Sequence, residues 1–255
     1  MDQVMDDIRY EEEFILNSRG LKLFTCRWLP YNQDPKALIF MCHGYAVECS
    51  ITMRGTASRL AKAGYAVHGI DYEGHGKSSG LQAYIPSFYA LVDDCFDHFT
   101  SVSEEMKPHR IVISILTQLC KIIPTWKLIP TQDIVDIAIK MPEKREKARR
   151  NHYCYHGKPR LKTGNELLMV SLEIENNLHE VSLPFLIVHG GDDIVTDPSV
   201  SQLLYESASS TDKMFKLYPE MWHALTSGEP EENIDLVFSD VISWLDQRAA
   251  TVEQR

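Results

Sequence analysis

Apolar and polar positions alternate at the start of the chain and then give way to continuous apolar runs. The alternation over Glu13–Leu29, broken by a short polar turn, predicts an opening β-hairpin. Two runs, Ala37–His43 and Tyr65–Asp71, are almost continuously apolar, which is typical of strands buried on both faces. The segment between them is interpreted as a helix that Ser50 caps and Gly64 ends. This order of strand, helix and strand predicts a βαβ unit with parallel strands.

The same order of helix and strand continues through the rest of the chain. A helix from about Asn165 precedes a buried strand at Pro184–His189, and a helix started by Asp197 and Pro198 precedes a strand at Met214–Tyr218. The helix opened by Pro86 and the final helix each carry apolar residues on one face, namely Phe88, Leu91, Cys95 and Phe99, and Ile234, Val237, Val241 and Leu245.

Alternating strands and helices indicate an α/β protein with a mainly parallel sheet and flanking helices. Residues 108–160 interrupt this order with apolar helical pieces, prolines and the charged run Lys140–Arg150. We interpret this stretch as an inserted helical cap. The sequence therefore predicts two parts of one core, residues 1–107 and 161–255, separated by the cap at 108–160.

Composition and charge exclude several classes of partner. The 255 residues are 44% apolar and 24% charged, as in an ordinary globular protein, and the formal net charge is −10. Nonspecific nucleic-acid binding needs a basic surface, so we expect no nucleic-acid partner. We expect at most peripheral membrane contact, through the cap. The spacing of histidines and carboxylates resembles no metal site, and we expect no metal and no cofactor.

The six cysteines form no CxxC pair, and we expect reduced thiols of a cytoplasmic protein, packed like small core residues at positions such as Cys42 and Cys49. The acidic segment Met1–Glu13 lacks an apolar stretch, so no secretory signal is expected there. Lysines and a proline break the apolar stretch Ile111–Pro130, which falls short of the roughly 20 apolar residues of a membrane-spanning helix.

Residues of types that often take part in catalysis follow three of the predicted strands. They lie at the carboxyl ends of the strands, where open parallel sheets commonly have their active sites. His43-Gly44 follows the first buried strand; such a turn can direct backbone N–H groups at an oxyanion, and a plain turn is the alternative. Asp193 follows a later strand and, unlike Asp197, has no helix to cap. His223 follows the next strand, where a surface histidine is the alternative. An acid and then a histidine in this order match the α/β-hydrolase arrangement.

Six segments spread over nearly the whole chain carry a more specific pattern: HGYAVECS (43–50), GIDYEGHGKSSG (69–80), IIPTWKLIPTQD (122–133), NHYCYHGKPRLKTG (151–164), SLPFLIVHGGDDIVTD (182–197) and KLYPEMWHAL (216–225). With these segments the chain resembles the plant monoacylglycerol lipase branch of the α/β-hydrolases, which includes lysophospholipase-like and caffeoylshikimate-esterase-like members. The resemblance implies a serine carboxylester hydrolase acting on monoacylglycerol or a related small ester. It implies that Asp193 is the triad acid, His223 the general base and Tyr45 an oxyanion-hole N–H donor.

The nucleophile that such enzymes require is missing. Their serine lies on a G-x-S-x-G turn between a strand and a helix, before the acid and the base. No glycine occurs from Leu81 to His156, the 76 residues in which this turn should fall. A whole strand–elbow–helix–strand block is absent, since a βαβ unit takes about 30 residues or more. We interpret the join at Glu104–Lys107 as an omitted exon or a gene-model gap, a hypothesis that sequencing the transcript tests.

One G-x-S-x-G does occur, at Gly76–Gly80, with Ser78 at its centre. It lies several residues beyond its strand, and Pro86 follows too soon for the helix that a nucleophile elbow feeds. We interpret it as a structural loop in which His75 is a hydrogen-bonded turn residue, and keep Ser78 only as a fallback nucleophile. No G-x-C-x-G or G-x-D-x-G occurs, so a substituted nucleophile is not expected either.

The sequence leaves alternatives open for the sheet, for the cap and for the function. Its loss exposes the edges of two interior strands, so either the later strands close up beside the earlier ones or the product is unstable. Ile113–Pro130 either lines an acyl tunnel or packs on the core. Lys140–Arg150 is interpreted as a solvated helix face rather than an anion site. Two functions remain: an impaired lipase-type esterase, or a non-catalytic truncated isoform that binds a ligand or regulates.

Overall fold

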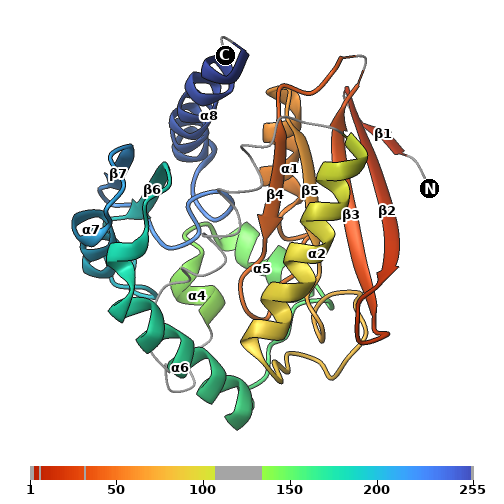
Figure 1. Cartoon of the computed structure of the whole chain (residues 1–255). Coiled ribbons are helices and arrows are strands. Elements are labelled where there is room, and N and C mark those ends of the chain that lie inside the picture. Colours follow the sequence, from red (N-terminus) through yellow and green to blue (C-terminus); the bar gives the residue numbers. More distant parts are fainter. Residues whose placement is uncertain (1–2, 6, 32, 107–133, 254–255) are drawn as a thin grey trace. The chain divides into compact units, whose positions relative to one another are not determined.

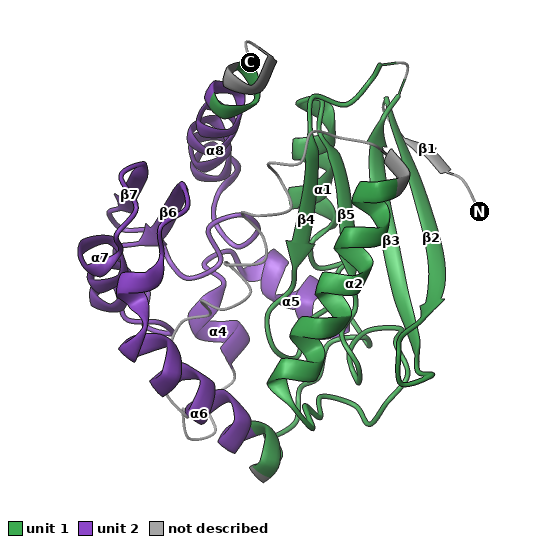
Figure 2. Ribbon diagram, in the orientation of Figure 1, with its two compact units in different colours: residues 1–116, 151–163, 248–255 green, residues 117–150, 164–247 purple. Residues whose placement is uncertain are grey.

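The computed structural model describes residues 3–5, 7–31, 33–106 and 134–253 (Figure 1). The chain divides into two compact units (Figure 2). Unit 1 comprises residues 1–116, 151–163 and 248–255, and unit 2 comprises residues 117–150 and 164–247.

Unit 1 is built on a five-stranded sheet with the order β1-β2-β3-β5-β4. Its strands are β1 (Gln3–Met5), β2 (Ile8–Leu16), β3 (Lys22–Pro30), β4 (Leu38–Cys42) and β5 (Ala66–Ile70). The predicted hairpin is confirmed as the antiparallel pair β2·β3, and it begins earlier than expected because Ile8 and Tyr10 already point into the core. The predicted parallel pair is confirmed as β4·β5.

Helices α1 (Arg54–Lys62) and α2 (Phe88–Met106) lie on opposite faces of this sheet (Figure 1). The predicted apolar face of α2 is confirmed, because all four of its residues are buried and Phe99 stacks on Phe40 of β4 with ring centroids 4.5 Å apart. The predicted cap of α1 is wrong: its N-cap is Met53, and the Ser50 hydroxyl instead donates to Glu48 at 2.7 Å. Gly64, with φ of +97°, takes the left-handed conformation just beyond the helix end.

Unit 2 holds a second sheet of two parallel strands. Its elements are α4 (Ile134–Ala138), α5 (Pro142–Arg150), α6 (Leu161–Asn176), η1 (Leu178–Glu180), β6 (Phe185–Gly190), α7 (Pro198–Ser207), β7 (Lys213–Tyr218) and α8 (Glu231–Glu253), of which α6 and α8 also extend into unit 1. The strands and the cap of α7 agree with prediction, since Asp197 accepts the Ser199 N–H. α6 begins about four residues earlier than predicted. No residue of α5 is buried, so the solvated charged helix is confirmed.

The outer edges of β4 and β6 are open in the described part of the chain. There, β4 pairs only with β5, and β6 pairs only with β7. Among the residues that the structure describes, the later strands β6 and β7 thus form a sheet of their own within unit 2. Cys42, at the end of β4, is exposed and not packed as predicted, whereas Cys26, Cys49 and Cys95 are buried.

Parts of the predicted cap fall outside the described residues, including all of Ile113–Pro130 and Cys120. The domain boundaries at 107/108 and 160/161 stay predictions. Among the helices that are described, none combines the length and the apolar character needed to cross a bilayer.

Candidate active site

Asp193 is the centre of the hydrogen-bonding network in unit 2. It lies in the loop after β6, is 7% exposed, and accepts five hydrogen bonds. The Val195 and Thr196 N–H groups donate to Oδ1 at 2.8 and 3.0 Å. The Thr196 hydroxyl, His223 and His189 contact Oδ2 at 2.6, 2.8 and 3.1 Å. The loop after β6 thus lets one carboxylate accept hydrogen bonds from two backbone N–H groups and three side chains.

The network keeps Asp193 ionised. Burial alone would raise the pKa of its carboxyl, but hydrogen bonds from His189, His223 and Thr196 outweigh burial and hold that pKa well below its ordinary value. Since an ionised carboxylate only accepts hydrogen bonds, the facing nitrogen of His223, Nδ1, carries a proton. In the neutral ring this leaves Nε2 unprotonated. His223 therefore has the tautomer that a general base needs, oriented by a buried acid.

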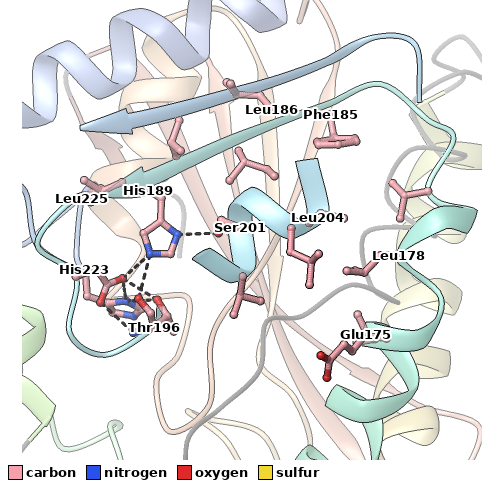
Figure 3. A pocket seen from close by; sticks show the side chains of 18 of the residues that line it. Glu175, Leu178, Phe185, Leu186, His189, Thr196, Ser201, Leu204, His223 and Leu225 are labelled. Atoms are coloured by element: carbon pink, nitrogen blue, oxygen red, sulfur yellow. Dashed lines mark hydrogen bonds and ion pairs between the residues drawn. The ribbon is translucent and has the colours of Figure 1, made fainter. Parts of the chain in front are cut away.

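A cavity of about 440 Å³ extends from this pair into unit 2 (Figure 3). Its wall is mostly apolar and comes from β6, α6, η1 and α7, with Phe185, Leu186, Ile187, Leu178 and Leu204 among the lining residues. Its polar end carries Asp193, His223, His189, Thr196 and Ser201. The volume is within the range of small-molecule sites, roughly 300–1,000 Å³. The cavity can hold a ligand with an apolar chain and a polar end group.

The loop after β4 belongs to unit 1. The His43 ring is 3% exposed; Nδ1 contacts Gly44 O at 2.7 Å, and Nε2 accepts the Tyr72 N–H at 3.1 Å. Burial lowers the pKa of His43 to about 4, so the ring is neutral and structural. The Tyr45 hydroxyl donates to Ala83 O at 3.1 Å, and burial raises its pKa to about 12.

Two buried carboxyls that sequence reasoning missed hold this loop in place. Glu48 is fully buried and accepts the N–H groups of Ile51 and Thr52 at 2.9 and 2.8 Å, besides the Ser50 hydroxyl. Asp71, also fully buried, accepts the Cys49 N–H at 2.9 Å. Glu48 lies inside the HGYAVECS segment, and an acid within an otherwise apolar loop was the available signal.

The Asp71 carboxylate also accepts the Lys77 N–H at 3.0 Å, which ties the loop after β4 to the Gly76–Gly80 loop. Ser78 in that loop has a structural role. Its hydroxyl donates to Asp71 O at 2.6 Å and accepts the Phe24 N–H at 2.8 Å. The predicted turn role of His75 is confirmed by the contact of Nδ1 with Glu73 O at 3.0 Å.

The structure thus brings Asp193 and His223 together in unit 2, and it places Tyr45 and Ser78 in unit 1. It also adds His189 and Ser201, which were not predicted. Their signal was weak in the sequence, because a histidine at a strand end and a serine twelve residues later in a helix meet only through tertiary packing.

Sequence comparison identifies relatives among esterases and lipases. Caffeoylshikimate esterase of Arabidopsis thaliana is 32% identical over 289 aligned positions, which cover 94% of this chain and 86% of that protein. Human monoglyceride lipase is 28% identical, covering 93% of this chain and 91% of the lipase. The 289 positions exceed the 255 residues of this chain by 34, so at least 34 positions of that alignment have no counterpart here.

Known structures show the same fold. A soluble variant of monoglyceride lipase from Saccharomyces cerevisiae, solved with a substrate analogue, superposes with a TM-score of 0.75 at 17% identity, covering 93% of this chain and 96% of that one. Residues 33–115 and 101–231 match the family described as serine aminopeptidase, S33. This chain therefore belongs to the serine aminopeptidase S33 family and has the α/β-hydrolase fold.

Proposed function

We propose that this chain is a monoacylglycerol-lipase-type protein that keeps the acid–base pair of the family but has lost serine-dependent ester hydrolysis. The observation that carries the proposal is the absence of any glycine from Leu81 to His156, which excludes a G-x-S-x-G turn from the segment where it belongs. The one serine in such a pattern, Ser78, has its hydroxyl engaged by Asp71 O and the Phe24 N–H.

In an intact enzyme of this type, the serine Oγ would attack the ester carbonyl and pass its proton to the base. In this chain His223 would be that base, Asp193 would orient it, and the N–H of Tyr45 would stabilise the oxyanion. Without the serine, the covalent route is lost, and only residual effects of binding and polarisation remain.

The length of the alignments supports a lost block rather than a single substitution. At least 34 positions of the Arabidopsis relative have no counterpart in this chain. A strand–helix–strand unit takes about 30 residues or more, so a deficit of this size accommodates the elbow and its flanking elements. The open edges of β4 and β6 are what such a loss leaves behind.

Ligand binding without hydrolysis is the second candidate, and the cavity beside Asp193 and His223 favours it. Its apolar wall and polar end fit a monoacylglycerol-like molecule, and several relatives are named for lipase activity on monoglycerides. In this second candidate function the chain acts as a non-catalytic ligand-binding or regulatory protein. We place this function in the cytoplasm, with any membrane contact peripheral and made by the cap.

Binding and hydrolysis are separated by two measurements on the purified full chain. A non-hydrolysable 1-O-alkylglycerol should bind saturably by calorimetry, whereas a monoacylglycerol should release glycerol no faster than in buffer. Leu204→Arg, which puts a charge on the cavity wall, should abolish binding; Leu236→Arg, on an exposed position of α8 outside the cavity lining, should not. Turnover that Ser78→Ala abolishes would refute the proposal.

A further inference from the structure

Asp193 contacts a second histidine, His189, and this histidine in turn contacts a serine, Ser201. His189 is the fifth residue of β6 and is 9% exposed. Its Nε2 lies 3.1 Å from Asp193 Oδ2 and 3.2 Å from Thr196 O, and its Nδ1 lies 2.7 Å from the Ser201 Oγ of α7. Figure 3 shows the His189 ring between Ser201 and the group of residues around Thr196 and His223.

The contacts of His189 fix where its proton lies. Nε2 faces a carboxylate and a backbone carbonyl, neither of which can donate, so Nε2 carries the proton. In the neutral ring Nδ1 is then an acceptor, and the Ser201 hydroxyl donates to it. The result is a hydroxyl directed at a bare imidazole nitrogen whose other nitrogen is held by a buried carboxylate. This is the order of groups that activates a serine nucleophile.

Ser201 also departs from the usual behaviour of a serine within a helix. Such a hydroxyl commonly bonds back to a carbonyl three or four residues earlier, whereas the Ser201 hydroxyl contacts His189. The side chain is half-buried at the polar end of the 440 Å³ cavity, so a molecule bound there can reach it. All of these residues belong to unit 2, and none lies on a G-x-S-x-G motif.

We propose that Ser201, His189 and Asp193 form a second nucleophilic site, which shares Asp193 with His223 but uses His189 as its base, and that this site reacts with activated acyl or phosphonyl groups bound in the cavity. With a fluorophosphonate, the Ser201 Oγ attacks phosphorus and a P–O bond forms. The hydroxyl proton passes to His189 Nδ1, the P–F bond breaks, and fluoride leaves. Asp193 stabilises the imidazolium through Nε2–H.

This site modifies itself once rather than turning over. Oxyanion stabilisation is usually the largest part of acyl-transfer catalysis, and helix N-terminal N–H groups are one source of it. In α7 these groups are engaged, because the Ser199 N–H donates to Asp197 Oδ1 and the Val200 N–H to Asp197 O. We therefore expect a stoichiometric adduct that forms slowly and persists.

The test is fluorophosphonate labelling of the full chain, with the adduct located by peptide mass spectrometry. The label should fall on Ser201 and disappear in Ser201→Ala. It should persist in Ser199→Ala, an exposed serine of the same helix, and it should be slowed less in His223→Phe than in His189→Gln. His189→Gln keeps a donor for Asp193 but has no basic nitrogen, and should slow labelling by about 10²-fold or more, the usual contribution of a general base.

Thermal unfolding of each variant shows whether the fold is kept, and Ser201→Ala and His189→Gln test the same prediction separately. No adduct on wild-type Ser201, or labelling that requires His223 and not His189, would overturn this inference and leave the proposed loss of hydrolysis intact. Ester turnover that Ser78→Ala abolishes would refute the proposed function without supporting this site. Ester turnover that Ser201→Ala abolishes would support the site and refute the proposed loss.

Discussion

Asn151 and Glu48 lie 103 positions apart in the chain and are joined by a buried hydrogen bond, in which the Asn151 amide donates to Glu48 Oε1 at 3.0 Å. Because Glu48 also holds the turn at 50–52, this contact links the last part of the predicted cap to the loop that follows β4. The Tyr155 N–H adds a bond to Ala46 O at 2.8 Å. The loop that carries Tyr45 is thus held by contacts from another part of unit 1.

Asn151→Ala should destabilise unit 1, because it leaves a buried carboxylate oxygen with one donor fewer. We expect a loss of about 1–3 kcal/mol in the free energy of unfolding, measured by urea denaturation. Asn176→Ala is the matched control, since Asn176 is exposed and contacts only the carbonyl of its own helix at Leu172 among the described hydrogen bonds. Equal stability losses in the two variants would show that the buried contact contributes nothing special.

Ser78→Ala should lower stability by a similar amount, about 1–3 kcal/mol, because the hydroxyl bridges the Phe24 N–H and Asp71 O. Ser79→Ala, in the same loop, should cost less, since the described contacts of Ser79 involve its backbone. Thermal melts of the two variants provide the comparison. If Ser78→Ala left stability unchanged but altered labelling by a fluorophosphonate, the structural interpretation of this loop would be wrong.

Acid should destabilise unit 1 through its buried histidines. Burial lowers the pKa of His43 and of His98 to about 4 and that of His68 to about 3, from an ordinary value of 6.5. The unfolded chain therefore takes up protons first as the pH falls. The stability that these neutral rings provide is complete above pH 6.5 and is lost progressively as the pH falls toward 3–4.

Asp71 acts in the opposite direction, because burial raises its pKa from 3.8 to about 6. Its contribution is present below pH 3.8 and is lost as the pH rises to 6, but three histidines outweigh one carboxyl. Unfolding free energies measured from pH 7.5 to 4 should therefore decrease by a few kcal/mol. His68→Phe should flatten this dependence, and a profile as steep as that of the wild type would contradict the assignment.

Several large apolar side chains are exposed in the described part of unit 2. Large side chains of α6 and β7 are 41–57% exposed, namely Leu168, Met169, Leu172, Met214 and Leu217. Such surface, together with the open β6 edge, predicts strong binding of a hydrophobic dye at pH 7. Leu168→Glu combined with Leu172→Glu should reduce dye fluorescence, whereas Glu173→Gln on the same helix should not. Absence of dye binding by the wild type would mean that another surface covers these residues.

Local patterns predicted much of the fold. The hairpin β2·β3, the parallel pairs β4·β5 and β6·β7 and the apolar face of α2 follow from periodicity and turn residues alone. The N-cap of α1 was not predicted correctly, because the buried carboxylate of Glu48 accepts a hydrogen bond from the Ser50 hydroxyl. The exposure of Cys42, the last residue of β4, was not predicted either, since the strand pattern indicated a buried run.

The candidate site was predictable only in part. Asp193 and His223 follow from their positions after successive strands, and the structure joins them at 2.8 Å. Glu48 is bound by Asn151, which lies 103 residues away in the chain, and Ser201 contacts His189, which lies on β6. Contacts of this kind depend on tertiary packing, which a single sequence does not encode in any local pattern.

The most direct test of the central claim is the rate of monoacylglycerol hydrolysis by the purified wild-type chain, compared with that of His223→Ala. If the base has no serine to deprotonate, the two rates should be equal and no higher than in buffer. A wild-type rate that saturates with substrate and falls by about 10²-fold or more in His223→Ala would show a working nucleophile and contradict the account.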